Sequence, residues 1–192
     1  MSNYRLGKDE LIGTLGKWDK FIPGRIKIHL VACGGTALTL LGYKESTKDV
    51  DLMVPVKKEY DVLIRFLNDA GYQKVSDSGW MRSDEKTIYD LYKGNRVFTT
   101  ELLSSPLDKG GNKKILELKK IYLGVLNPID WIVTKMFRGS SVDIDDCAAL
   151  ARHQKIDLKK LEARFRETAQ YDVSEERALK NLSLILKIIK KI

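Results

Sequence analysis

The stretch from Cys33 to Pro55, CGGTALTLLGYKESTKDVDLMVP, constrains the fold more than any other part of the chain. It opens with two glycines and a threonine, continues through an apolar segment of helical character, and ends in Asp-Val-Asp-Leu. We expect a short helix over 36–41 and a strand over 49–54. Because Asp49 and Asp51 are two residues apart, a strand would project both carboxylates from the same face.

Two carboxylates held side by side repel each other unless a cation lies between them. Oxygen ligands on a rigid strand suit Mg²⁺, which takes one or two carboxylates and completes its shell with water and substrate phosphates. Gly34 and Gly35 would let backbone N–H groups approach a phosphate closely, and the N-terminus of the following helix points to the same place. The stretch therefore predicts a metal–triphosphate site. The alternative, a glycine turn before a surface helix and an ordinary edge strand, leaves the two acids unexplained.

Gly34-Gly35-Thr36, a gap of twelve residues, and then Asp49-Val50-Asp51 resemble the signature of the nucleotidyltransferase superfamily that includes DNA polymerase β. The segments 34–38 and 47–51 look more closely like the minimal and abortive-infection (AbiEii-type) branches. The resemblance implies an α+β (α/β) nucleotidyltransferase fold, with a small mixed β-sheet flanked by helices and followed by a C-terminal helical bundle. It also implies an NTP-dependent enzyme of the EC 2.7.7 type, which moves an NMP from a nucleoside triphosphate such as ATP to an acceptor hydroxyl.

A third acid, Asp90, stands in the β-prone and largely apolar run 87–92, where burial without a partner would be costly. In the family a third carboxylate comes from a later strand beside the Asp-x-Asp strand, and the resemblance implies Asp90 for this role. Asp49, Asp51 and Asp90 would then bind Mg²⁺ or Mn²⁺ as the catalytic acids. Glu101 competes for the role of Asp90, but the run around Asp90 resembles members of the group more closely. An exposed acid on a solvent-facing strand is the other interpretation of Asp90.

From Pro128 the pattern is helical to the end, which predicts a catalytic domain over 1–126 and a helical domain over 127–192. Lys135 and Arg138 are three residues apart and share one flank of a helix. The resemblance identifies Lys135 with a lysine of a later family motif, whereas Val142 occupies a position where the family usually has lysine.

Cations at positions 135 and 138 could neutralise a triphosphate. Gly34, Gly35 and the Thr36 hydroxyl would hold its β- and γ-phosphates. An ordinary amphipathic helix with solvated cations is the alternative for Lys135 and Arg138. Asp143, Asp145 and Asp146 are more typical of a charged helix N-terminus than of a metal site.

The composition, 43% hydrophobic and 31% charged, is that of a soluble globular protein. No apolar run approaches the roughly 18 to 20 residues that span a bilayer, and the N-terminus lacks the apolar region of a secretory signal. The two cysteines, Cys33 and Cys147, match no metal spacing. We therefore expect a cytoplasmic protein without a membrane partner.

The net charge of +8 is compatible with a nucleic acid partner. Residues 152–192 contain eleven Lys or Arg against six Asp or Glu. This surplus and the toxin-type resemblance favour RNA, with tRNA first, as the acceptor, while a protein side chain or a small molecule stays open. A cognate antitoxin, or self-association through the C-terminal helices, is a further expectation. The alternative class is a catalytically silent nucleotide- or RNA-binding module on the same fold.

Overall fold

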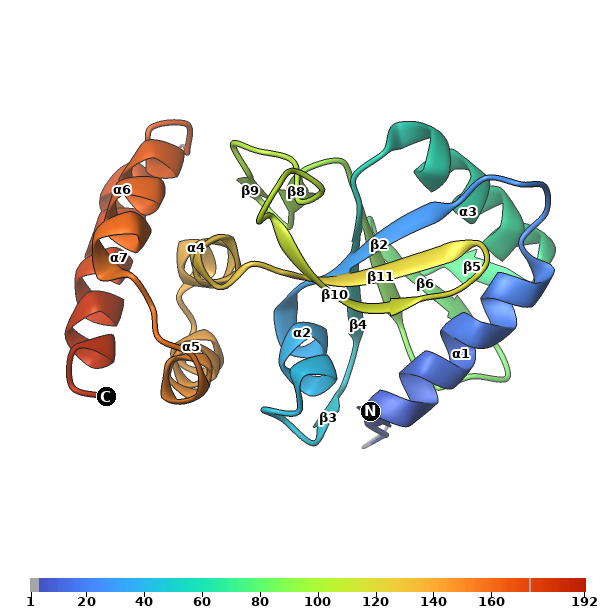
Figure 1. Cartoon of the computed structure of the whole chain (residues 1–192), viewed down its shortest axis with the longest axis horizontal. Helices are drawn as coiled ribbons and strands as arrows, with labels where there is room; N and C mark the ends of the chain where they lie inside the picture. The colour runs from blue at the N-terminus through green and yellow to red at the C-terminus, as the bar shows by residue number, and fades with distance from the viewer. Residues whose placement is uncertain (1–3, 173) are drawn as a thin grey trace.

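The computed structural model describes residues 4–172 and 174–192, and it combines a mixed β-sheet with helices that pack against it and a group of four helices at one end (Figure 1). The helices are α1 (Lys8–Phe21), α2 (Gly34–Leu41), α3 (Lys57–Asp69), α4 (Pro128–Arg138), α5 (Ser141–His153), α6 (Leu158–Ala169) and α7 (Glu175–Ile189). This architecture confirms the predicted α+β fold class with a helical C-terminal part.

The main sheet has seven strands, and its central strands are apolar runs buried on both faces, as expected where helices cover a sheet. In spatial order they are β10 (Asn112–Glu117), β11 (Ile121–Leu126), β2 (Ile28–Ala32), β4 (Val50–Val54), β7 (Tyr89–Lys93), β6 (Gly79–Arg82) and β5 (Tyr72–Lys74). Two small pairs complete the β-structure: β1 (Leu6–Gly7) with β3 (Ser46–Thr47), and β8 (Arg96–Val97) with β9 (Thr100–Glu101).

The register between β4 and β7 matters most for the site. These strands are parallel neighbours, and Asp51 is the direct partner of Asp90. Paired residues of adjacent parallel strands project from the same face of the sheet, and the strands lie about 4.8 Å apart. The fold therefore brings together two acids that are 39 positions apart in the sequence.

The helices α1 and α3 lie at the end of the sheet away from the four C-terminal helices (Figure 1). Trp18 of α1 is buried, and its ring contacts Phe66 of α3, with ring centroids 6.3 Å apart. It also contacts Tyr72 at 5.7 Å and Tyr89 at 4.9 Å. This aromatic group anchors both helices to β7 and to the edge strand β5.

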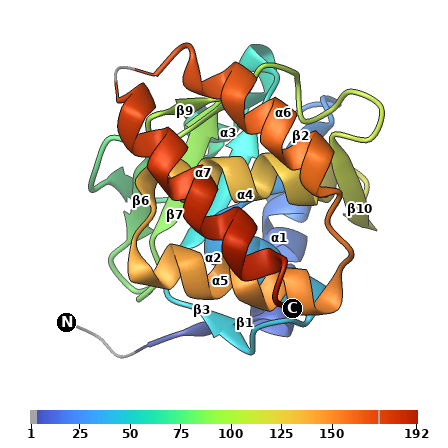
Figure 2. The same ribbon diagram turned by 90° about the vertical axis from the view of Figure 1, so that its left-hand side faces the viewer.

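Of the C-terminal helices, α4 and α5 lie nearer the sheet, and α7 crosses both of them on the outer side (Figures 1 and 2). Asn127 caps α4 by accepting hydrogen bonds from the backbone of Ile129 and Asp130, as its position before Pro128 predicts. Leu182 and Ile185 of α7 are buried, so the apolar stripe of the last helix packs within the chain. The buried residues of the sheet and of the helical part belong to one continuous core.

The structure corrects one detail of the sequence interpretation. Gly34 and Gly35, expected in a turn before the helix, form the first turn of α2. Residues 112–114 begin β10, where Asn112 accepts a hydrogen bond from the hydroxyl of Tyr122 on β11. The helical part begins at Pro128, but the division into domains at 126 stays a prediction.

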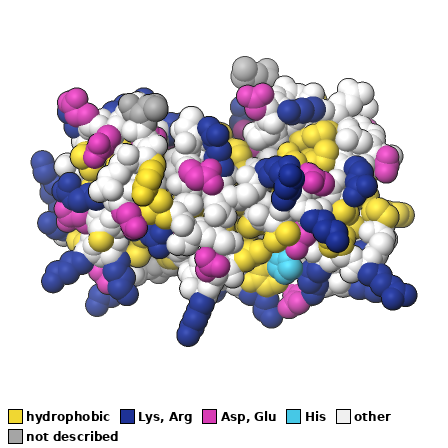
Figure 3. Space-filling view, turned by 90° about the horizontal axis from the view of Figure 1, so that it is seen from above, with side chains coloured by type: hydrophobic (Ala, Val, Ile, Leu, Met, Phe, Trp, Pro, Cys, Tyr) yellow, Lys and Arg dark blue, Asp and Glu magenta, His cyan; other side chains and the backbone are white. Residues whose placement is uncertain are grey.

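The described surface carries charges of both signs. In the view of Figure 3, Lys and Arg side chains are interspersed with Asp and Glu and do not form one continuous basic face. None of the helices within residues 4–172 and 174–192 has the length and apolar character needed to cross a membrane. Cys33 and Cys147 are both buried free thiols.

Candidate active site

The site begins where β2 ends and α2 starts. Gly34 has φ +53°, a conformation that favours glycine. A Cβ atom at this position would overlap the carboxylate of Asp51, so the first turn of α2 packs directly on β4. The indole Nε1 of Trp131 in α4 donates a hydrogen bond of 3.0 Å to the carbonyl oxygen of Gly34. The backbone of Gly34 is thus held between the acid and the helical part of the molecule.

Thr36 occupies a different place from the one expected. Its side chain is fully buried, its Oγ1 donates to the carbonyl oxygen of Asp49 at 3.2 Å, and it accepts from the backbone N–H of Asp51 at 2.8 Å. Thr47 Oγ1 also donates to the carbonyl oxygen of Asp49, at 2.8 Å. Both hydroxyls fix the Asp-x-Asp segment, so the Thr36 hydroxyl is engaged by the protein backbone in this structure.

The three predicted acids line one cavity of about 350 Å³ together with Gly34 and Gly35. Asp51 and Asp90 come from β4 and β7, and Asp49 lies just before β4. Glu101, the competitor of Asp90, is exposed on β9 and does not line this cavity. The structure therefore brings together all three acids and the glycine pair.

Burial and, to a smaller extent, the negative charge of Asp90 raise the pKa of Asp51 to about 7, against the opposing effect of Lys135. Burial also raises the pKa of Asp90, against a hydrogen bond of 2.6 Å that Ser78 Oγ donates to its Oδ1. Tyr92 adds a hydrogen bond of 3.4 Å to Asp51 Oδ1. Ionised, these acids are a cluster of like charge that a cation would stabilise.

The donor chemistry at this cavity fits a hard divalent cation, but the protein alone does not surround one. In the described part of the chain, no group of three or more His, Cys, Asp or Glu side chains is placed to hold a metal ion. Mg²⁺ usually takes only one or two carboxylates and fills its octahedral shell with water and substrate phosphates. The acids therefore suit an ion that arrives with a triphosphate, and the metal site itself stays a prediction.

Lys135 lines the same cavity, although it is only 7% exposed. Its Nζ lies 3.1 Å from Asp143 Oδ1 and 2.8 Å from Asp146 Oδ2. Burial lowers the pKa of Lys135, but the hydrogen bonds and charges of Asp146 and Asp143 outweigh this effect and raise it. Lys44 Nζ, at 2.9 Å from Asp146 Oδ1, joins the network from the segment after α2. Lys135 is thus a charged residue held inside an ion network, not a solvated cation.

Arg138 is half exposed at the mouth of the cavity. Its Nε and Nη2 bind the two oxygens of Asp143 at 2.7 and 2.6 Å, and its guanidinium lies 5.0 Å from the ring centre of Phe98. Asp143 also forms a capping box with Ser140 at the start of α5. Burial raises the pKa of Asp143, but the hydrogen bonds from Arg138 and Ser140 and the charge of Lys135 reverse this and lower it.

The sequence interpretation missed three further cations at the cavity: Arg5, Lys44 and Lys48. Arg5 is tied to Ser46 by hydrogen bonds of 2.9 Å to its hydroxyl and to its carbonyl oxygen. Lys48 is exposed and has no ion pair among the described residues. Its position next to Asp49 was an available signal, whereas nothing in the sequence around Arg5 linked it to the site.

Residues 112–191 match the model of a family described as "Nucleotidyltransferase of unknown function (DUF6036)". The matched range contains Lys135 and Arg138 but neither the glycine pair nor the three acids. It spans less than half of the 192 residues. The match supports a place for this chain among the nucleotidyltransferases, and the AbiEii-type branch stays a prediction.

No curated protein matches the chain. A crystal structure from H. pylori that is provisionally described as a nucleotidyltransferase is 18% identical over 97% of this chain and 97% of that chain, with a TM-score of 0.47. JHP933 from Helicobacter pylori is 16% identical over 96% of this chain and 91% of that chain, also with a TM-score of 0.47. At TM-scores below 0.5, neither likeness carries an argument about function.

Proposed function

We propose that this chain is a metal-dependent nucleotidyltransferase that moves an NMP from a nucleoside triphosphate to an acceptor hydroxyl. One observation carries the proposal: Asp51 and Asp90 are register partners on β4 and β7, in a cavity whose wall is the glycine-containing first turn of α2. A plain structural role would not explain two half-buried carboxylates that face each other beside a glycine that cannot accept a side chain.

In the reaction, the acceptor oxygen forms a bond to the α-phosphorus while the bond from that phosphorus to pyrophosphate breaks. The backbone N–H groups of Gly34 and Gly35 bind the β- and γ-phosphates at the start of α2. Lys48 and Arg138 offset the charge of the leaving pyrophosphate at the mouth of the cavity. Asp90 accepts the proton of the attacking hydroxyl at Oδ2, the oxygen that Ser78 leaves free.

Asp49, Asp51 and Asp90 would hold Mg²⁺ or Mn²⁺ together with the triphosphate. Such an ion, when bound, neutralises phosphate charge and stabilises the attacking and leaving oxygens. The protein's own contribution is positioning: Thr36 and Thr47 fix the backbone of Asp49, and Trp131 fixes that of Gly34.

We propose RNA as the acceptor, and tRNA before other RNAs, because the net charge of +8 favours a polyanionic partner. A cytoplasmic location is consistent with an RNA acceptor. A toxin role with a cognate antitoxin rests on the resemblance to AbiEii-type proteins. Because Leu182 and Ile185 of α7 are buried, an antitoxin or a second copy would contact the C-terminal helices through exposed residues such as Leu184 and Ile192.

The second candidate is a silent nucleotide- or RNA-binding module on the same fold. It is favoured by the lack, within the described residues, of three side chains already placed around a metal position. Binding of Mg-NTP without turnover would support it.

The test is incubation of the purified chain with each α-labelled NTP, Mg²⁺ or Mn²⁺, and either total RNA or total protein, followed by identification of the labelled molecule. We expect label on RNA, and at least a 100-fold lower rate for Asp51→Asn and Asp90→Asn, because two metal-binding acids act in one transition state. Asp145→Asn is the matched control, because Asp145 is exposed and does not line the cavity. Full transfer activity in Asp51→Asn would rule out the assigned site.

A further inference from the structure

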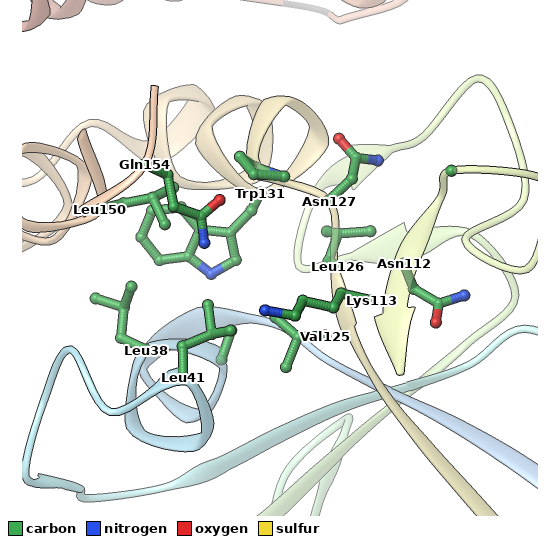
Figure 4. A pocket seen from close by; sticks show the side chains of 13 residues that line it. Leu38, Leu41, Asn112, Lys113, Val125, Leu126, Asn127, Trp131, Leu150 and Gln154 are labelled. Atoms are coloured by element: carbon green, nitrogen blue, oxygen red, sulfur yellow. The ribbon is translucent and has the colours of Figure 1, made fainter. Parts of the chain in front are cut away.

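A second pocket lies between α2, the β10–β11 hairpin, α4 and α5, and it shares no lining residue with the acid-lined cavity. Figure 4 shows Leu38 and Leu41 on one side of it, and the indole of Trp131 with Leu150 on another. Val125 and Leu126 of β11 complete the apolar wall. The pocket is therefore built from the buried faces of four elements, not from a single surface loop.

The size of the pocket suits a single aromatic ring. Its volume is about 160 Å³. An apolar cavity of about 150 Å³ lined by Leu, Ile and Phe side chains can stay dry and bind benzene. Well-formed apolar pockets with a few convergent polar groups are typical of small-molecule sites.

The polar residues around this pocket differ in how far they are already engaged. Asn112 Nδ2 donates to the carbonyl oxygen of Pro106, and its Oδ1 accepts from Tyr122. Asn127 caps α4, and Gln154 Nε2 donates to the hydroxyl of Tyr43 at 3.1 Å. The three amide side chains are thus already engaged within the protein. Lys113 is the charged side chain of the lining, and it is available to a ligand.

Lys113 extends its side chain over the pocket toward the indole of Trp131 (Figure 4). Among residues 4–172 and 174–192, no carboxylate forms an ion pair with it, whereas its neighbour Lys114 pairs with Glu117 at 3.3 Å. A lysine can bury its methylene stem along an apolar surface and keep its ammonium at the rim. An anionic group attached to the ring would therefore meet a cation as the ring enters.

We propose that this pocket binds a small single-ring aromatic carboxylate, with the ring between Leu38, Leu41 and Trp131 and the carboxylate on Lys113. The site does not depend on the proposed transferase activity. The pocket is nevertheless connected to the acid-lined cavity through Trp131. The indole of Trp131 lines the pocket and donates a hydrogen bond to the carbonyl oxygen of Gly34, which lines the acid-lined cavity.

The probe is benzoate, and the measurement is isothermal titration calorimetry with the full chain in the absence of nucleotide. We expect saturable one-to-one binding of benzoate. Benzyl alcohol keeps the ring but not the charge, and acetate keeps the charge but not the ring, so each should bind at least about tenfold more weakly.

Two variants test the position of the ligand. Lys113→Met keeps the stem and removes the charge, so we expect about tenfold weaker binding of benzoate, whereas Lys114→Met, one residue further along β10, should bind as the wild type does. Leu41→Phe adds a ring inside the pocket and should abolish binding; circular dichroism and thermal unfolding establish that it folds. Lack of saturable benzoate binding, equal binding of benzyl alcohol, or unchanged affinity in Lys113→Met would each overturn the proposal.

Discussion

Asp51 is the residue at which packing and charge conflict most directly. The fold holds its carboxyl group beside Gly34 and opposite Asp90, and burial raises its pKa from the usual 3.8 to about 7. Between these two pH values the folded chain binds a proton that the unfolded chain has released. The contribution of Asp51 to the free energy of unfolding is therefore most favourable below about pH 4, and it falls as the pH rises to about 7.

We predict that Asp51→Asn raises the free energy of unfolding at pH 8, in buffer without divalent cations, by about 2–4 kcal/mol. The upper limit follows from roughly 3 pKa units at about 1.4 kcal/mol each. Denaturant unfolding from pH 5 to pH 8 measures the effect, with the exposed Asp145→Asn as the control. The wild type and the Asp145→Asn variant should lose stability across this range more steeply than Asp51→Asn. If the free energy of unfolding changed with pH in the same way in all three proteins, the ionised Asp51 carboxylate would not be destabilising.

The acid pair at positions 49 and 51 was predictable, because strand geometry alone places residues i and i+2 on one face. Asp90 required the family resemblance, since nothing local links it to a strand 39 positions earlier. The role of Thr36 was not predictable, because a threonine after two glycines gives no sign of which backbone groups its hydroxyl binds. The ion pairs of Lys135 with Asp143 and Asp146 likewise depend on how α4 and α5 pack.

At the scale of elements, the contact between the first turn of α2 and β4 decides whether the site can form. Gly34→Ala would place a methyl group against the Asp51 carboxylate, at a φ that disfavours any side chain. We predict a loss of about 1–3 kcal/mol in the free energy of unfolding and at least a 100-fold loss of nucleotidyl transfer. Thermal unfolding and the labelled-NTP assay measure the two effects.

Gly13→Ala in α1 is the matched control for this substitution. A Cβ atom at Gly13 meets nothing within 4 Å, so alanine there should stabilise the helix by about 0.5–1 kcal/mol. If Gly34→Ala behaved in the same way, the close approach of α2 to β4 would not constrain the site.

Most helices and strands were predictable from periodicity and from glycine and proline breaks, but their arrangement was not. Leu11, Leu15 and Trp18 recur at helical spacing and are the buried residues of α1, and the apolar run at 26–33 contains β2. The order of the seven strands, and the parallel pairing of β11 with β2 and of β7 with β4, depend on contacts across the whole chain. Those contacts set the Asp51–Asp90 register, so secondary structure alone could not have located the site.

At the scale of the molecule, the sheet and the helical part are joined by polar contacts near the cavity as well as by the common core. Asp146 of α5 lies between Lys44, which follows α2, and Lys135 of α4. Tyr43 stacks on His153 of α5, with ring centroids 4.4 Å apart. The helical part thus fixes the cations of the site relative to the acids of the sheet.

We predict that Asp146→Asn destabilises the whole chain, because it removes the charge that Lys44 and Lys135 share in a buried place. Breaking a buried pair from one side leaves an uncompensated cation, and we expect a loss of about 2–4 kcal/mol in the free energy of unfolding. Lys135 keeps Asp143 as a partner, which limits the loss. Glu176→Gln, which breaks the exposed pair of Glu176 with Lys180, is the control and should leave stability unchanged. Equal stability of both variants in denaturant unfolding would mean that the buried network does not hold the two parts together, and that the core alone does so.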